Sequence, residues 1–275
     1  MPSAYAHDRF GSEVRKELPR DLRKMIDDHR NLFYIGLQGP DPFYYYNPLK
    51  ENAMTALAEE IHAMTGSEFF TRVEPVSDEE LIYLAGFLCH FALDASCHWY
   101  ISQYMKAKGV THEEIEGEFD RYLLVEDGLD PVKAVKTEHF HPENASAAVI
   151  CHFFRRFYAS SQKEDAMKNV LSVKNVEKSL QGFVRFEGIL RCPGDMKRNT
   201  LYWVLKRVGK YDTLKGHITN KEENPACRES STGLFTLYTE AIPDAVSLTK
   251  DFLRRDTTNF VQNPLLAYNF LGQTL

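Results

Sequence analysis

A nearly continuous apolar segment between residues 81 and 101 carries three polar side chains of metal-ligand type, His90, Asp94 and His98, at intervals of four residues. Because a helix turns by about 100° per residue, side chains at i, i+4 and i+8 lie on one face. Apolar residues nearly all around such a helix indicate that it is buried in the core. The segment therefore predicts a buried helix with one polar stripe.

This polar stripe needs partners, because an unpaired carboxylate or imidazole in an apolar interior costs on the order of several kcal/mol. His112 and Glu116 repeat the four-residue step after a short connection. In that connection Gly109 and Thr111 are typical of a helix stop and a helix N-cap. Two helices can thus bring five ligand-type residues to one centre. A purely structural polar network is the alternative, and the ligand types and their geometry favour a metal.

Three earlier residues offer further ligands: His7, Asp41 and His62. Taken singly, each has an ordinary explanation, as a surface residue near the terminus, a turn former beside two prolines and a solvated helix position. Together with the central cluster they exceed what one tetrahedral site needs, so more than one ion is expected.

The order of these residues resembles the zinc-dependent phospholipase C family, which includes bacterial phosphatidylcholine-hydrolysing enzymes and clostridial alpha-toxin catalytic domains. The resemblance covers residues 4–125 and runs through an early His, an Asp after a Gly-Pro turn, a His, a His-x-x-x-Asp pair, another His and a His-x-x-x-Glu pair. Segments 36–41 and 90–94 look like local motifs of this family. The step from Asp94 to His98 is shorter than in its best-known members.

The resemblance implies a trinuclear zinc site. One zinc would be held by Asp41, His62, His90 and Asp94. A second would be held by His98, His112 and Glu116. A third would be held by His7 and Asp94, which makes Asp94 the carboxylate that bridges two ions. Secreted relatives complete the third site with a processed amino terminus, whereas this chain begins Met1-Pro2-Ser3 and shows no signal peptide. Either removal of Met1 exposes Pro2, or the third metal is held differently.

The resemblance also implies a zinc-dependent phosphoric ester hydrolase of the phospholipase C type. Closely spaced zinc ions neutralise a phosphodiester and lower the pKa of bound water toward about 7, so that metal-activated water can attack phosphorus. Asp41 is the catalytic candidate, because its family counterpart is assigned to orienting or deprotonating that water; the alternative makes Asp41 a ligand only. A phospholipid or other small phosphodiester is the expected substrate. The alternatives are zinc nuclease activity, phosphomonoesterase activity and a non-catalytic metal-binding protein.

Aromatic residues bear on the substrate. The run 43–46 and the pair Phe69 and Phe70 could line the site and bind a choline head group or a nucleobase, or they could simply pack in the core. Pro42 stands where choline-recognising relatives have an aromatic residue. Phosphatidylcholine specificity is therefore not expected to carry over.

Composition fits an intracellular enzyme of bacterial type. The formal net charge of −6 disfavours nucleic acid and anionic membranes as partners. No run of about eighteen apolar residues is found, so no transmembrane helix is expected. The five cysteines are odd in number and scattered, which suggests reduced thiols and a cytoplasmic location. The sequence leaves the oligomeric state open.

No segment shows convincing strand alternation, so one all-α domain is expected over residues 1–275, with the metal motifs concentrated in residues 4–125. Breaks are expected at Gly39-Pro40, Pro142 and Pro193-Gly194, and a loop between Lys215 and Thr232. The expected helical runs are 12–30, 50–64, 78–107, 112–125, 142–158, 163–179, 182–208 and 231–254.

Overall fold

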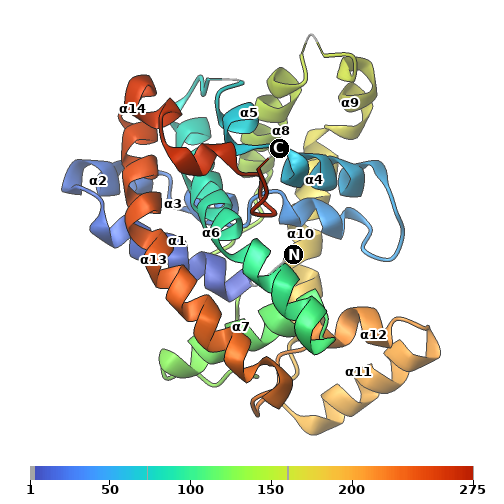
Figure 1. Cartoon of the computed structure of the whole chain (residues 1–275). Coiled ribbons are helices and arrows are strands. Elements are labelled where there is room, and N and C mark those ends of the chain that lie inside the picture. Colours follow the sequence, from blue (N-terminus) through green and yellow to red (C-terminus); the bar gives the residue numbers. More distant parts are fainter. Residues whose placement is uncertain (1–3, 73, 160, 275) are drawn as a thin grey trace.

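The computed structural model describes residues 4–72, 74–159 and 161–274. Within these ranges the chain is helical, with two isolated β-bridges and no β-strand, so the predicted all-α fold is confirmed (Figure 1). The helices up to residue 126 are α1 (Ala4–Glu17), α2 (Arg20–Asp28), α3 (Arg30–Gly36), α4 (Ala53–Ala63), α5 (Gly66–Phe70), α6 (Asp78–Lys108) and α7 (His112–Glu126).

The later part of the chain wraps around these helices. Its helices are α8 (Asn144–Phe157), α9 (Glu164–Val170), α10 (Val173–Leu190), α11 (Asp195–Arg207), α12 (Tyr211–Leu214), α13 (Arg228–Leu253) and α14 (Thr257–Val261). The 3-10 helices are η1 (Asp41–Tyr46), η2 (Lys215–His217), η3 (Pro225–Cys227) and η4 (Pro264–Ala267). In Figure 1 the long helix α13 runs beside α6 and α1, while α11 and α12 project from one end.

Helix α6 is the centre of the core. Ser77 caps its first turn by accepting a hydrogen bond from the Glu80 amide, and Gly109 ends it in the left-handed conformation at φ 68°. By length and composition α6 could cross a membrane, but 94% of its most apolar window is buried inside the protein. The predicted buried helix with one polar stripe is therefore what the structure shows.

Two glycines let α3 cross closely over α6. A Cβ atom on Gly36 would lie 2.1 Å from the Tyr83 carbonyl oxygen, and one on Gly86 would lie 2.2 Å from the Phe33 carbonyl oxygen. The backbones of the two helices therefore meet where neither has a side chain. This contact places the loop that follows α3 directly beside the polar stripe of α6.

The predicted helices 78–107 and 112–125 are confirmed as α6 and α7, each of which ends one residue later than predicted. The predicted connection between them is confirmed too. Thr111 caps α7 in a capping box with Glu114, and His112 is its first residue. The expected breaks at Gly39-Pro40, Pro142 and Pro193-Gly194 also lie outside α-helices.

Several other predicted boundaries are wrong. The expected gap after residue 179 falls inside α10, where Leu180 is buried, and the true break lies at Leu171, before the N-cap Ser172. The expected run 12–30 is two helices separated at Pro19. The segment expected to be a loop between Lys215 and Thr232 contains η2 and η3 and the start of α13.

The first helix also begins earlier than predicted. Two of the residues of α1 that face the core are His7 and Gly11, which interrupt the apolar pattern from which a helix is inferred. The same helix continues from Ala4 to Glu17 without a break. This early start matters because it places His7 on a rigid element.

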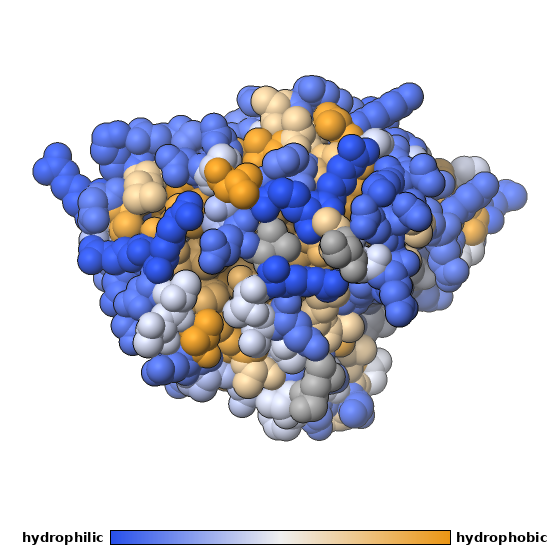
Figure 2. Space-filling view, turned by 90° about the horizontal axis from the view of Figure 1, so that it is seen from above, coloured by the Kyte–Doolittle hydropathy of each residue, from blue (hydrophilic) through white to orange (hydrophobic). Residues whose placement is uncertain are grey.

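Seen from above, the surface is mostly hydrophilic, with small separate groups of hydrophobic residues (Figure 2). All five cysteines are buried and free in the structure.

Candidate metal centre

All eight residues predicted as metal ligands lie together, on five separate elements. They come from α1, η1, α4, α6 and α7, and their ligand atoms form three groups in which all atoms lie within 4.8 Å of one another. The groups are His7, His90 and Asp94; Asp41, His62 and His90; and His98, His112 and Glu116. The structure thus brings the predicted residues together, with His90 belonging to two groups.

The Asp41 group joins η1, α4 and α6. The Oδ1 atom of Asp41 lies 3.2 Å from Nε2 of His62, and Asp41 is 1% exposed. Nδ1 of His62 lies 2.8 Å from the carbonyl oxygen of Ala58. A carbonyl oxygen accepts only, so Nδ1 carries the proton and Nε2 presents a lone pair to Asp41. An orienting bond of this kind is typical of a metal-binding histidine.

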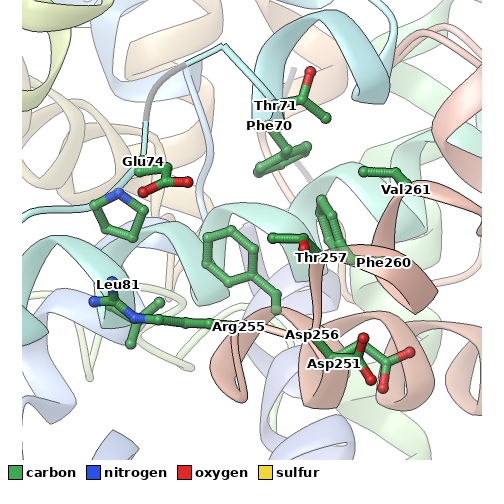
Figure 3. A pocket seen from close by; sticks show the side chains of 12 residues that line it. Phe70, Thr71, Glu74, Leu81, Asp251, Arg255, Asp256, Thr257, Phe260 and Val261 are labelled. Carbon is green, nitrogen blue, oxygen red and sulfur yellow. The ribbon is translucent and has the colours of Figure 1, made fainter.

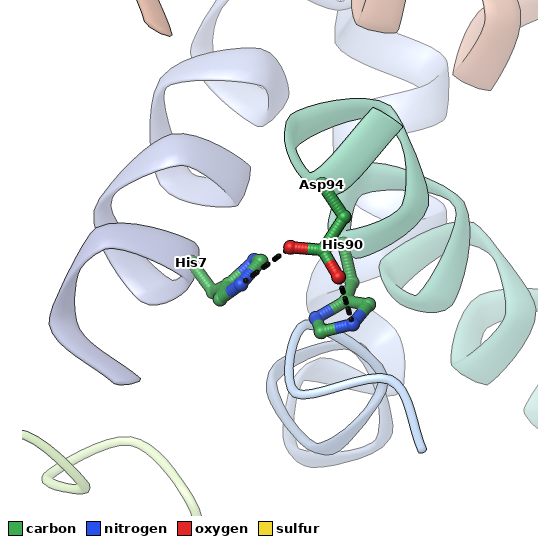
Figure 4. Close-up of side chains that lie close together, drawn as sticks. All are labelled: His7, His90 and Asp94. Carbon is green, nitrogen blue, oxygen red and sulfur yellow. Dashed lines mark ion pairs between the residues drawn. The ribbon is translucent and has the colours of Figure 1, made fainter. Parts of the chain in front are cut away.

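The His7 group lies where α1 meets α6 (Figure 4). Nε2 of His7 lies 3.3 Å from Oδ1 of Asp94, and Nε2 of His90 lies 3.1 Å from Oδ2 of Asp94. The rings of His7 and His90 stack with their centroids 4.2 Å apart. Asp94 therefore directs one oxygen toward each histidine.

The third group joins α6 and α7. Oε1 of Glu116 lies 2.9 Å from Nε2 of His112 and 3.5 Å from Nε2 of His98. Nδ1 of His98 lies 2.5 Å from the carbonyl oxygen of Phe270, which fixes Nε2 as the nitrogen that faces Glu116. Its other neighbour is Asp94, whose Oδ2 atom lies 3.7 Å from Nδ1 of His98.

The histidines keep the buried carboxylates ionised. Burial on its own would raise the pKa of Asp94, but His98 and His90 lower that pKa well below its usual value. Burial would likewise raise the pKa of Glu116, and His112 lowers it well below its usual value. For His98 the effects are reversed, because burial lowers its pKa while Asp94 and Glu116 raise it to about 9. Ionised carboxylates are the form in which these residues bind a metal.

The donor set fits zinc. Both oxygens of Asp41, Nε2 of His62 and both ring nitrogens of His90 are buried and form no directed hydrogen bond within the described ranges, although they lie close to one another. Carboxylate oxygens and imidazole nitrogens that lie this close together without directed hydrogen bonds are the donor types that hold a zinc ion. A cavity of about 20 Å³, the size of one water molecule or ion, lies among His7, Asp94, His98 and Glu116.

A family model described as zinc dependent phospholipase C matches residues 6–167, more than half of the chain. The chain belongs to the zinc dependent phospholipase C family. No curated protein and no solved structure shows significant similarity to it. All eight clustered residues lie inside the matched range, so the family match covers every residue of the three groups. Zinc is the ion that the family description names.

Gly39 lets the loop before η1 lie against His90. It has a φ of +51°, and a Cβ atom there would lie 2.3 Å from Cδ2 of His90. Gly39→Ala should therefore displace the His90 imidazole and lower the zinc content. The left-handed backbone should also destabilise this variant by about 1–2 kcal/mol. Elemental mass spectrometry measures the zinc. Gly209→Ala is the matched control, because Gly209 has a φ of +66° and a Cβ atom there would have no neighbouring atom within 4 Å. Equal zinc loss in both variants would refute the His90 contact as the cause.

Phe270 is a part of the centre that the sequence does not reveal. Its carbonyl orients His98, and its ring packs 5.6 Å from the His62 ring and 6.0 Å from the His90 ring, measured between centroids. A backbone carbonyl carries no residue signature, and Phe270 lies far along the chain from the family motifs. The carboxy-terminal segment thus contributes to this candidate metal centre.

The aromatic residues divide into two groups. Phe43, Tyr45, Phe69 and Phe70 are buried, and Phe69 stacks on Phe87, so the packing interpretation holds for them. Tyr44 differs, because its hydroxyl lies 3.4 Å from Nδ1 of His62 and its ring borders a cavity of about 250 Å³. Glu113, which follows His112, borders the same cavity.

The ligand-type side chains in the described part of the chain differ in their exposure to solvent. The side chain of His112 is 26% exposed, whereas those of His7, Asp94 and His98 are at most 6% exposed. The 250 Å³ cavity is lined by Tyr44 and Glu113, which neighbour His62 and His112, but by none of the eight ligand-type residues themselves. A second cavity of about 330 Å³ lies between α5, α13 and α14, is lined by Phe70, Phe252 and Phe260 among others, and includes no histidine (Figure 3).

Proposed function

We propose that this member of the zinc dependent phospholipase C family hydrolyses the phosphodiester bond of a phospholipid, with Asp41, His62, His90, Asp94, His98, His112, Glu116 and His7 as zinc ligands. The observation that carries the proposal is the convergence of three histidine and carboxylate groups at a centre where the side chain of His112, 26% exposed, is the most accessible of the eight. Bound zinc would polarise the phosphate and lower the pKa of water.

The protein's own residues have distinct roles in this proposal. Asp41 has two buried oxygens without a directed hydrogen bond in the described chain, so it can hold zinc through one and orient a proton-bearing group through the other. Ala58 and Phe270 keep His62 and His98 in the tautomer that binds a metal. Leu93 and Cys97 of α6 flank the ligands and are 4% and 6% exposed, so they shield this part of the centre from solvent.

The cavity beside the centre fits a head group. Its volume of about 250 Å³ is below the usual range for a drug-sized ligand, so it suits a small polar group rather than acyl chains. Its lining mixes Lys50 and Lys210 with Glu51 and Glu113, around aromatic Tyr44. We infer that the phosphorylated head group occupies this cavity while the acyl chains stay outside it.

The test is a comparison of substrates. Zinc-loaded protein is expected to release diacylglycerol and a phosphorylated head group from a short-chain phospholipid faster than it cleaves single-stranded DNA or p-nitrophenyl phosphate. Faster cleavage of DNA would favour a nuclease, and faster release of phosphate from the monoester would favour a phosphomonoesterase. Bound zinc with no turnover of any ester would favour the non-catalytic alternative.

A substitution tests the cavity itself. Tyr44→Ala should lower kcat/KM for the phospholipid at least about tenfold, because the ring that borders the cavity is lost. Tyr46→Ala is the control, since Tyr46 lies on the same 3-10 helix but packs against Lys178, with Nζ 3.8 Å from its ring centroid. Zinc content should stay unchanged in both variants. An equal loss of activity in both would contradict the role of this cavity.

A further inference from the structure

Helix α7 carries a third acidic or histidine side chain on the face that bears its two metal ligands. Asp120 follows His112 and Glu116 at the same interval of four residues. It is 0% exposed and belongs to none of the three metal groups. Its carboxylate faces the first turn of α1 instead.

Asp120 binds the backbone of α1 immediately before His7. Its Oδ1 atom accepts a hydrogen bond from the Ala6 amide at 3.0 Å, and its Oδ2 atom accepts one from the Tyr5 amide at 3.4 Å. The first amides of a helix lack partners within the helix and carry partial positive charge, so a carboxylate binds them well. The residue after Ala6 is His7, whose Nε2 atom lies 3.3 Å from Asp94.

A buried cation supports this carboxylate. Nζ of Lys136 lies 3.2 Å from Oδ2 of Asp120 and 3.3 Å from Oε2 of Glu187. Burial raises the pKa of Asp120 to about 6, against the lowering effect of Lys136. Burial on its own would lower the pKa of Lys136, but Glu187 and Asp120 raise it above its usual value. The lysine therefore stays charged and keeps Asp120 in the form that accepts both amide hydrogen bonds.

We propose that Asp120 is a positioning residue for the His7 metal site: its carboxylate holds the first turn of α1 so that His7 stands beside Asp94. Helix α7 then serves two metal sites, one through His112 and Glu116 and the other through the backbone of α1. This inference rests on the proposed zinc centre and adds to it a buried anchor outside the ligand set. Because Asp120 touches no ligand atom, its effect on metal binding is indirect.

The first test is the zinc content of Asp120→Asn, which keeps the size of the side chain but loses its charge and one acceptor. We expect this variant to lose about one zinc per chain, or to bind that zinc at least about tenfold more weakly. Asp127→Asn is the matched control, because Asp127, the C-cap residue of α7, also binds residues of α1. Asp127 accepts hydrogen bonds from the Tyr5 hydroxyl at 2.6 Å and from Nε of Arg9 at 2.8 Å, and it does not touch the backbone of α1. It should keep the full zinc content.

The second test separates positioning from general destabilisation. In a His7→Ala background, Asp120→Asn should cause no further zinc loss, because both changes act on one site. A double variant that loses as much zinc as the two single variants together would overturn the inference. An Asp120→Asn protein that binds zinc like the wild type would also overturn it. If His7→Ala also binds zinc like the wild type, the proposed His7 site fails together with the inference.

A measurement on the wild-type protein covers the case in which Asp120→Asn does not fold. In metal-stripped protein, the Tyr5 and Ala6 amides should exchange with solvent at least about tenfold more slowly than in an unstructured peptide of the same sequence. Exchange that is fast without zinc and slow only with zinc would overturn the inference, since the metal rather than Asp120 would then order this turn.

Discussion

Asp94→Asn is expected to lose more zinc than any other single ligand substitution, about half of the bound metal or more. The carboxylate of Asp94 lies beside a histidine of each of the three ligand groups. Its Oδ1 atom is 3.3 Å from Nε2 of His7, and its Oδ2 atom is 3.1 Å from Nε2 of His90 and 3.7 Å from Nδ1 of His98. Removing its charge should weaken the binding of two zinc ions, whereas His112→Ala should weaken the binding of only one. Elemental mass spectrometry on the purified variants measures the difference.

Glu80→Gln provides the matched control for Asp94→Asn. Glu80 is another buried carboxylate of α6, 2% exposed, but it binds His152 and Arg156 rather than the metal residues. Its loss should destabilise the protein while the zinc content stays the same. Equal zinc contents in Asp94→Asn and the wild type would refute the bridging role of Asp94.

Removing zinc with a chelator should abolish hydrolysis and lower the melting temperature together. Five elements of the fold converge on the centre, so zinc bound there would stabilise the folded state, because the unfolded state lacks the site. At free zinc about a thousand times Kd, bound metal stabilises the folded state by about 4 kcal/mol, which corresponds to about 8–16 °C in Tm for a chain of this size. Differential scanning calorimetry and the phospholipid assay on the same samples measure both effects.

Re-addition of zinc should restore both properties. The Asp94→Asn protein, which starts with less metal, should show a smaller fall in Tm on chelation. Activity that survives chelation while Tm falls would show that the metals are structural, and the hydrolytic mechanism would then be wrong.

The ligand set and the central helices could be predicted from the sequence because their signal is local. A spacing of four residues on an apolar helix places His90, Asp94 and His98 on one face whatever the rest of the chain does. His112 and Glu116 follow the same rule after a recognisable stop and N-cap. His7, Asp41 and His62 needed the family resemblance, since each has an ordinary explanation on its own.

The supporting parts of the centre could not be predicted because they depend on tertiary contacts. Phe270 acts through a carbonyl that every residue has, more than 170 residues from its partner. Asp120 repeats the spacing of the α7 ligands, and only the structure shows that it binds the backbone of α1 instead. The early start of α1 was hidden because His7 and Gly11 occupy inward positions.

Zinc content per chain, measured by elemental mass spectrometry on wild-type protein purified without an affinity tag, tests the central claim most directly. Three groups of ligands predict about two to three zinc ions per chain. No stoichiometric metal, even after zinc has been supplied, would contradict the zinc centre and leave only the helical fold in place.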